Sequence, residues 1–98
     1  MIRFTTPTHE LTVEGMDLTG AEVYVTYTQG CKKITFNNVD TEFCCGDTRV
    51  SVNLTQEQTS EFEPGAAYVQ VNWIENGKRN ATKKALIKVY ENSLDEVI

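Results

Sequence analysis

The sequence has little of the side-chain chemistry that catalysis and metal binding need. Its one histidine, His9, excludes a cluster of imidazoles as a metal site or general-base network, and we expect it at the surface. The three cysteines, Cys31, Cys44 and Cys45, are odd in number and have no C-x-x-C spacing. Adjacent cysteines rarely bond to each other. We therefore expect no metal ion and reduced structural thiols, with a Cys31–Cys44 cross-strand bridge as an open alternative.

Other catalytic patterns are also missing. No G-K-[ST] follows Gly15 or Gly20, so there is no phosphate-binding loop. The carboxylates near Cys44 lack the spacing of a calcium loop. Glu61 and Glu63 are the best pair for glycoside chemistry, but nothing in the sequence places them across a cleft. We therefore expect a protein that is not an enzyme and has no cofactor.

Charge and hydropathy restrict the partners. The formal net charge is −5 and the nine Lys and Arg residues are scattered, which disfavours nucleic acid. No segment approaches the roughly 18 to 20 apolar residues of a membrane helix. Residues 1–10 lack the apolar centre of a signal peptide. We therefore expect no nucleic-acid partner, no membrane, no signal peptide, and assembly in the cytoplasm.

What the sequence does contain is apolar–polar alternation with a period of two. This period places one apolar set on one face of an extended strand, half buried and half exposed. Three segments show it clearly, and their predicted core residues are Val23, Val25 and Tyr27, then Val50, Val52 and Leu54, then Val69, Val71 and Trp73. Most of the chain is therefore predicted to build antiparallel sheet.

Turn and capping signals divide the rest of the chain. The first predicted strands are 22–29, 32–36, 39–43 and 49–54, with turns at Gln29-Gly30, Asn37-Asn38 and Gly46-Asp47. Thr55 and Gln58 form a capping box, which predicts a short helix over 56–62 that is stopped by Pro64-Gly65. Phe62 would plug one end of the core.

The last hairpin poses a problem of register. A two-residue turn at Asn76-Gly77 pairs Trp73 with Asn80 and turns Ala85, Ile87 and Val89 to the wrong face. We therefore predict a three-residue loop, Glu75–Gly77, with Gly77 left-handed in a bulge. This loop would bring Ala81, Ala85 and Ile87 to the side of Val71 and Trp73, with Lys83 as an unexplained inward residue.

These elements predict an all-β fold in a single domain over 1–98. About seven strands, one short helical turn and no crossover helix indicate an antiparallel β-sandwich or flattened barrel, Ig-like in general shape. Residues 1–8 are a candidate extended arm, and residues 91–98 are a candidate peripheral tail in which Leu94, Val97 and Ile98 can dock.

One surface of this sandwich is less polar than expected. Outward positions are normally polar, yet they include an aromatic and aliphatic stripe made of Tyr24, Tyr68, Ile74, Leu86 and Tyr90. Tyrosine among small polar residues is typical of protein interfaces. The alternatives are that the arm or the tail covers the stripe, or that its aromatic rings stack on sugars.

The second half of the chain also resembles a family. The resemblance rests on the segments 50–59, 69–73, 81–82, 87–89 and 94–98, together with Phe62, Gly65, Gly77 and Arg79. The first half contributes only Leu11, Val13, Asp17-Leu18 and 23–27. The pattern resembles small β-sandwich structural proteins of tailed phages and prophages of Firmicutes, and the N-terminal domain of phage baseplate upper proteins. The resemblance implies a non-enzymatic accessory or assembly component of a virion, whose partners are other virion proteins or further copies of itself.

Overall fold

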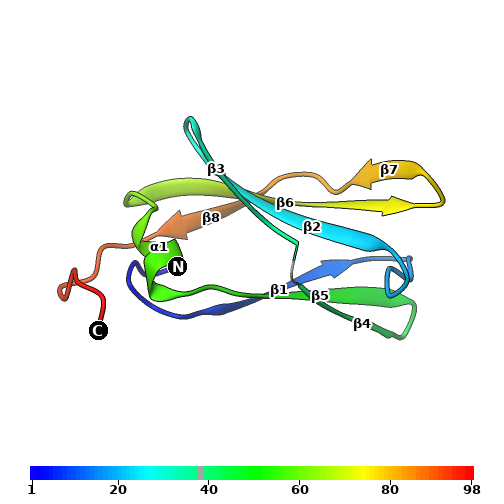
Figure 1. The fold of residues 1–98 in the computed structure, drawn as a ribbon, viewed down its shortest axis with the longest axis horizontal. Coiled ribbons are helices and arrows are strands. Elements are labelled where there is room, and N and C mark those ends of the chain that lie inside the picture. Colours follow the sequence, from blue (N-terminus) through cyan, green and yellow to red (C-terminus); the bar gives the residue numbers. More distant parts are fainter. Residues whose placement is uncertain (38) are drawn as a thin grey trace.

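Two antiparallel sheets pack face to face in the computed structural model, which describes residues 1–37 and 39–98 (Figure 1). The smaller sheet has the order β1 (Thr8–Val13), β5 (Asp47–Asn53), β4 (Asp40–Cys44). The larger sheet has the order β3 (Lys32–Phe36), β2 (Glu22–Gln29), β6 (Gly65–Glu75), β7 (Lys78–Ala81), and β8 (Ala85–Val89) also pairs with β6. The one helix of these ranges, α1 (Gln56–Ser60), joins β5 to β6. The predicted β-sandwich is confirmed, whereas its Ig-like type stays a prediction.

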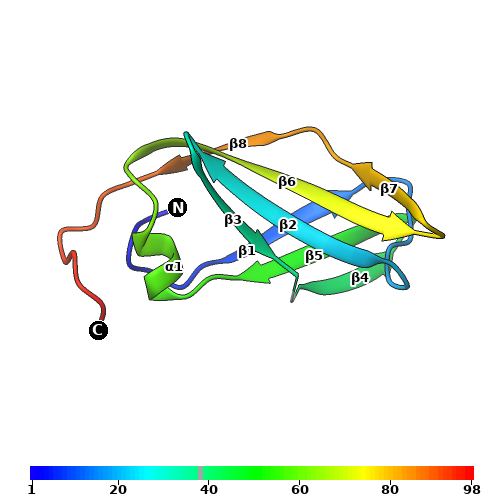
Figure 2. The same ribbon diagram turned by 45° about the horizontal axis from the view of Figure 1, so that its top comes forward.

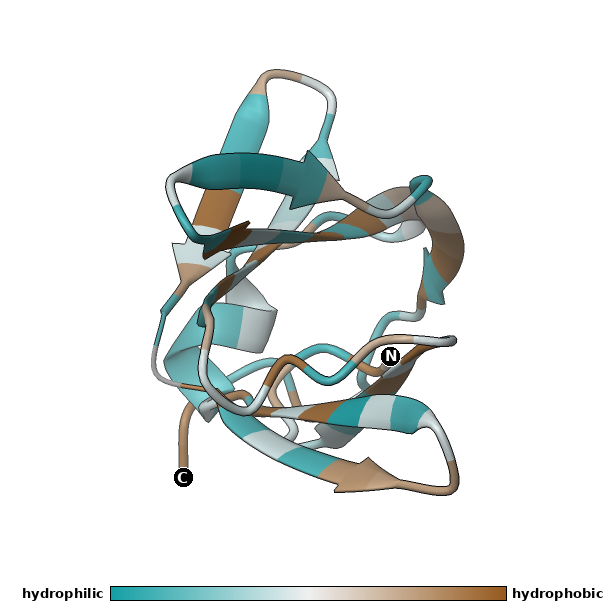
Figure 3. Ribbon diagram, turned by 90° about the vertical axis from the view of Figure 1, so that its right-hand side faces the viewer, coloured by the Kyte–Doolittle hydropathy of each residue, from teal (hydrophilic) through white to brown (hydrophobic). Residues whose placement is uncertain are grey.

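The core lies between the sheets, where the alternation predicted it. Figure 3 views the sandwich along its long axis, with one sheet above the other. The predicted inward residues of β2, β5 and β6, together with Leu54 just beyond β5, are all buried, and so is Phe62. They bury apolar area because every second side chain of a strand points to the same face.

The capping box forms as predicted. The Thr55 amide donates to Gln58 Oε1 at 2.8 Å, and the Gln58 amide donates to Thr55 Oγ1 at 3.2 Å. The helix ends at Ser60, two residues earlier than expected. Phe62 follows it and lies edge-on to Tyr27, with 5.9 Å between the ring centroids. The helix thus places Phe62 as the plug at one end of the core.

Two strands, β4 and β5, have bounds that differ from the prediction. The strand expected over 39–43 is β4, Asp40–Cys44, and the turn predicted at Asn37-Asn38 lies partly outside the described residues, because Asn38 is not among them. β5 begins at Asp47 rather than Arg49. The reason is that Cys45 and Gly46, with φ of 58° and 86°, form a tight turn directly after β4.

The three-residue loop predicted for the last hairpin is wrong. Glu75 pairs with Lys78 and Trp73 with Asn80, so the turn contains two residues. Asn76 and Gly77 have φ of 53° and 77°, the left-handed values that a type I′ turn requires. Ala81 therefore lies opposite Asn72 and is exposed.

The change of register occurs later, at residues 82–84. Between the pairs Asn72–Ala81 and Val69–Ala85, β6 advances by three residues and the returning chain by four. This extra residue is a bulge. The Thr82 amide donates to the Val71 carbonyl at 2.9 Å, and Thr82 Oγ1 accepts from the Val71 amide at 3.1 Å. Ile87 and Val89 thereby reach the core side, while Lys83 and Ala85 stay exposed.

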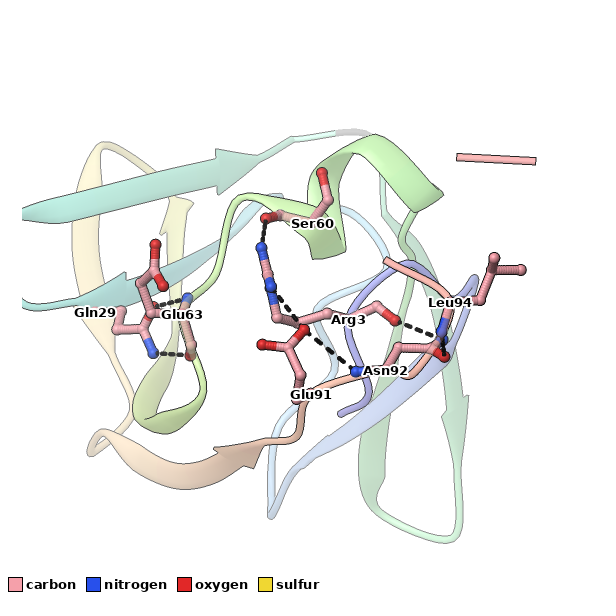
Figure 4. A network of polar contacts seen from close by, with 7 residues as sticks. All are labelled: Arg3, Gln29, Ser60, Glu63, Glu91, Asn92 and Leu94. Atoms are coloured by element: carbon pink, nitrogen blue, oxygen red, sulfur yellow. Dashed lines mark hydrogen bonds and ion pairs between the residues drawn. The ribbon is translucent and has the colours of Figure 1, made fainter. Parts of the chain in front are cut away.

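Both ends of the chain lie beside α1 (Figure 2). Ile2 makes a parallel bridge to Tyr90. Arg3 donates to the Ser60 carbonyl and to Glu91 Oε1, both at 2.8 Å, and Asn92 donates to the Arg3 carbonyl (Figure 4). The first residues therefore pack against α1 and the end of β8. In the tail, Gln56 exchanges two hydrogen bonds with the backbone of Ile98, but Leu94, Val97 and Ile98 keep their side chains exposed.

The sequence predicted His9 at the surface, but His9 is half-buried and its ring lies beside the buried ring of Tyr27. Its Nδ1 lies 2.7 Å from the Tyr27 hydroxyl, and the two rings are 5.8 Å apart. Burial lowers the pKa of His9 from its ordinary value of 6.5. Burial also raises the pKa of Tyr27 well above its usual range, so this hydroxyl stays protonated.

Acid is therefore expected to destabilise the fold through His9. The unfolded chain takes up the imidazole proton at a higher pH than the folded chain, so the free energy of unfolding decreases as pH falls through 6.5 toward the lowered folded value. Urea unfolding at intervals between pH 7.5 and about pH 5 measures this slope. In His9→Asn, whose amide keeps a polar atom near the position of Nδ1 but does not titrate, the slope should disappear. An equal slope in both proteins would contradict the assignment to His9.

Candidate interaction surface

The five residues predicted to form an outward stripe all lie on the outer face of the larger sheet. Tyr24 belongs to β2, Tyr68 and Ile74 to β6, and Leu86 to β8, while Tyr90 follows β8 directly. Each is next in the chain to at least one inward, buried or partly buried residue, so the strand period turns it to solvent. The exposed fractions are 45% for Tyr68, 38% for Ile74, 57% for Leu86 and 55% for Tyr90, and Tyr24 is partly exposed.

The pairing of the strands divides these residues into two groups. Tyr68 lies directly opposite Leu86 across β6 and β8, and Tyr90 is four residues further along the same face. We call Tyr68, Leu86 and Tyr90 the β6–β8 patch. Neither the arm nor the tail covers it in the described part of the chain, as the exposed fractions show.

Tyr24 and Ile74 belong to the second group, which is more polar. They line a shallow surface depression of about 320 Å³ together with Thr26, Thr35, Asn72 and Arg79. The Tyr24 hydroxyl donates to Glu22 at 3.2 Å, and this hydrogen bond raises the pKa of Tyr24. Arg79 Nε and one terminal nitrogen each lie 3.4 Å from Asn72 Oδ1. We call this hollow the Tyr24 depression.

A polar strip separates the β6–β8 patch from the Tyr24 depression. Gln70 stands between Tyr68 and Asn72 on the outer face of β6, and its amide donates to the Thr82 carbonyl at 2.8 Å. Sequence reasoning placed Asn72 on this outward face but missed Arg79 as a lining residue. The two-residue turn at Asn76-Gly77 was the signal for Arg79, because that turn pairs Arg79 with Ile74.

Several residues considered for metal binding or thiol chemistry lie on the smaller sheet or in its β4–β5 turn, namely Glu42, Cys44, Cys45 and Asp47. All three cysteines are free and exposed. Among residues 1–37 and 39–98 there is no group of three or more His, Cys, Asp or Glu side chains that could hold a metal ion. Glu42 and Asp47 line a different hollow, beside Cys44, Cys45 and Arg49 on the smaller sheet.

The chain matches no protein-family model and no curated protein sequence. In the described ranges no helix has the length and apolar character needed to cross a membrane.

Proposed function

We propose that this protein is a non-enzymatic accessory or assembly component of a tailed-phage or prophage particle, which acts through protein–protein contacts. Its partners are other virion proteins or further copies of itself, and its place of action is the virion assembled in the bacterial cytoplasm. The sequence resemblance suggests the particle, and the β6–β8 patch suggests the mode of action. An Ig-like type of sandwich belongs to the same proposal and is supported by the two antiparallel sheets packed face to face. The position of β2 departs from an Ig order, because β2 pairs with β3 and β6 in the larger sheet and not with β5 in the smaller one.

The observation that supports contact-based function is the exposure of the β6–β8 patch. Tyr68 and Leu86 are cross-strand neighbours and each leaves about half of its surface in water. A sheet face that stays in solvent normally carries polar side chains. Tyrosine buries much area at low entropic cost and is enriched in the residues that dominate binding energy. A partner that covers this patch would therefore gain affinity mainly from these two side chains.

The double variant Tyr68→Ser/Leu86→Ser tests the patch. It should fold normally, because both side chains are outside the core, and it should weaken self-association or partner binding by about 10-fold or more. Sedimentation velocity measures association of the chain alone, and mass spectrometry of gradient-purified particles measures its incorporation. Phe43→Ser is the matched control, since Phe43 is 45% exposed but lies on the smaller sheet.

The results of these two measurements test the contact surface and the virion assignment separately. If the double variant unfolds while its association state is unchanged, the patch is part of the core and the proposal fails. If the wild-type chain occurs only outside purified particles, the virion assignment fails, whereas the contact surface can still be tested by sedimentation. Incorporation at a stoichiometry that matches a symmetric ring or lattice would support both.

The alternative function is recognition of a carbohydrate on a host surface, and the Tyr24 depression favours it. An aromatic ring, a guanidinium group, an amide and two hydroxyls converge there, which is the mixture of stacking and hydrogen-bonding groups that a sugar requires. This alternative predicts that added sugar changes the tyrosine fluorescence of a monomer and that Arg79→Ala abolishes the change. The structural proposal predicts association and no response to sugar.

A further inference from the structure

The turn between β4 and β5 brings two adjacent thiols to the same side of the chain. Successive side chains of a strand normally point to opposite faces. Cys44 is the last residue of β4, but Cys45 has a φ of 58°, which turns its side chain back toward Cys44. The two Sγ atoms are 3.3 Å apart, and both residues are exposed. The left-handed conformation costs a non-glycine residue roughly 1 to 2 kcal/mol, so the fold holds this pair of thiols against a local preference.

The distance between the two sulfur atoms indicates which kind of ligand they can bind together. A disulfide bond is roughly 2.05 Å long, so a gap of 3.3 Å is that of two separate thiols. A linear two-coordinate ion would need about 4.6 Å, twice a metal–sulfur bond of about 2.3 Å. Two bonds of about 2.3 Å at a right angle span about 3.3 Å, which is the arrangement around a pyramidal trivalent centre. We propose that Cys44 and Cys45 form a dithiol site for trivalent arsenic compounds.

The residues around the two thiols leave space for the third substituent of such an arsenic compound. Cys44 and Cys45 line a hollow of about 270 Å³ together with Thr12, Glu42, Asp47 and Arg49. Two thiolates satisfy two of the three bonds of trivalent arsenic, and the third substituent, a hydroxyl or an organic group, would lie in this hollow. A tetrahedral zinc ion would need further protein ligands. Glu42 and Asp47 line the same hollow, but among the described residues no three His, Cys, Asp or Glu side chains are grouped closely enough to hold a metal ion.

The reaction is a condensation and needs no oxidant. The hydrogen bond with Cys45 raises the pKa of the Cys44 thiol, so Cys44 carries its proton at neutral pH. With phenylarsine oxide, each sulfur forms one bond to arsenic, the bond between arsenic and oxygen breaks, and the two thiol protons leave with that oxygen as one water molecule. Arsenic stays trivalent and no electrons are transferred.

Phenylarsine oxide and mass spectrometry of the intact protein test the site. The wild-type chain should take up one phenylarsine per molecule, and the thiols that react with Ellman's reagent should fall from three to one. Cys31→Ser, the matched control, should still take up one phenylarsine. In Cys44→Ser and in Cys45→Ser only one bond to sulfur holds the arsenic. Release of the adduct should therefore take roughly 100-fold less competing monothiol than release from the wild type. A small 1,2-dithiol should release it from the wild type.

Circular dichroism must first show that each serine variant is folded, which is expected because both side chains are exposed. The proposal is overturned if the wild type forms no adduct, if Cys31→Ser loses it, or if either single variant at the turn holds it as strongly as the wild type. A wild-type adduct that excess monothiol removes as readily as dithiol would also overturn it, since this would show a single bond to arsenic. None of these results bears on the β6–β8 patch, which lies on the other sheet.

Discussion

Trp73→Ala is expected to lower the free energy of unfolding by about 3 to 5 kcal/mol, the usual cost of deleting a large buried aromatic side chain. Trp73 is 5% exposed and lies on the inner face of β6, between Val23 of β2 and Asn80 of β7. Removing the indole leaves a cavity where three strands meet. A domain of this size has a total stability of only about 5 to 15 kcal/mol, so the variant is expected to lose a large part of its stability and to unfold at a much lower urea concentration.

Trp73→Phe separates the loss of volume from the loss of the indole N–H. Trp73 Nε1 is buried and has no hydrogen-bond partner among the described residues. An unsatisfied buried donor costs about 1 to 3 kcal/mol. Removing the indole N–H in Trp73→Phe should therefore offset part of the stability that is lost with the smaller ring. We expect a net loss below about 1.5 kcal/mol, measured by urea unfolding of both variants. If Trp73→Ala were as stable as the wild type, the placement of Trp73 in the core would be wrong.

The features of the fold that the sequence predicted correctly are those determined by residues close to one another in the chain. The period of two identified the buried faces of β2, β5 and β6, because the pleat of a strand fixes which side chains share a face. The capping box located the start of α1 within a single turn of helix. Both signals are local, and the structure confirms both.

The last hairpin shows where such reasoning fails. The sequence correctly indicated that the returning strand changes register by one residue, since Ile87 and Val89 must reach the core. It could not indicate where, because either the turn or the strand can absorb the extra residue. Asn76-Gly77 is a preferred sequence for a two-residue type I′ turn, and Thr82 replaces the missing backbone partner of Val71 with its own hydroxyl. The bulge therefore forms in the strand.

The candidate surface was predictable in part for the same reason. The parity of each strand indicated that Tyr24, Tyr68, Ile74, Leu86 and Tyr90 point outward. Their grouping depends on which strands are neighbours, and this is set by contacts between distant segments. Because β8 pairs with the first half of β6 and β7 with the second half, Tyr68 meets Leu86 while Ile74 meets Arg79. The left-handed φ of Cys45 also had no signal, since cysteine does not favour that region.

Phe62→Ala is expected to cost as much as the loss of Trp73, about 3 to 5 kcal/mol, although Phe62 belongs to no strand. The ring is fully buried and is held in place by the short helix that precedes it. It packs edge-on against Tyr27, whose ring in turn lies 5.6 Å from that of Phe36 at 90°. Edge-on aromatic pairs add about 0.5 to 1.5 kcal/mol beyond the area that they bury.

The size of this loss tests whether α1 closes the core or only connects two strands. Phe43→Ala removes the same side chain from a position that is 45% exposed and should cost less than about 1 kcal/mol, because little buried area and no enclosed cavity are involved. Urea midpoints with unchanged slopes give both values. A large loss at Phe62 and a small one at Phe43 mean that α1 stabilises the sandwich by inserting one aromatic ring between the sheets. Equal losses would mean that this end of the core collapses around the missing ring, and α1 would then act only as a connection.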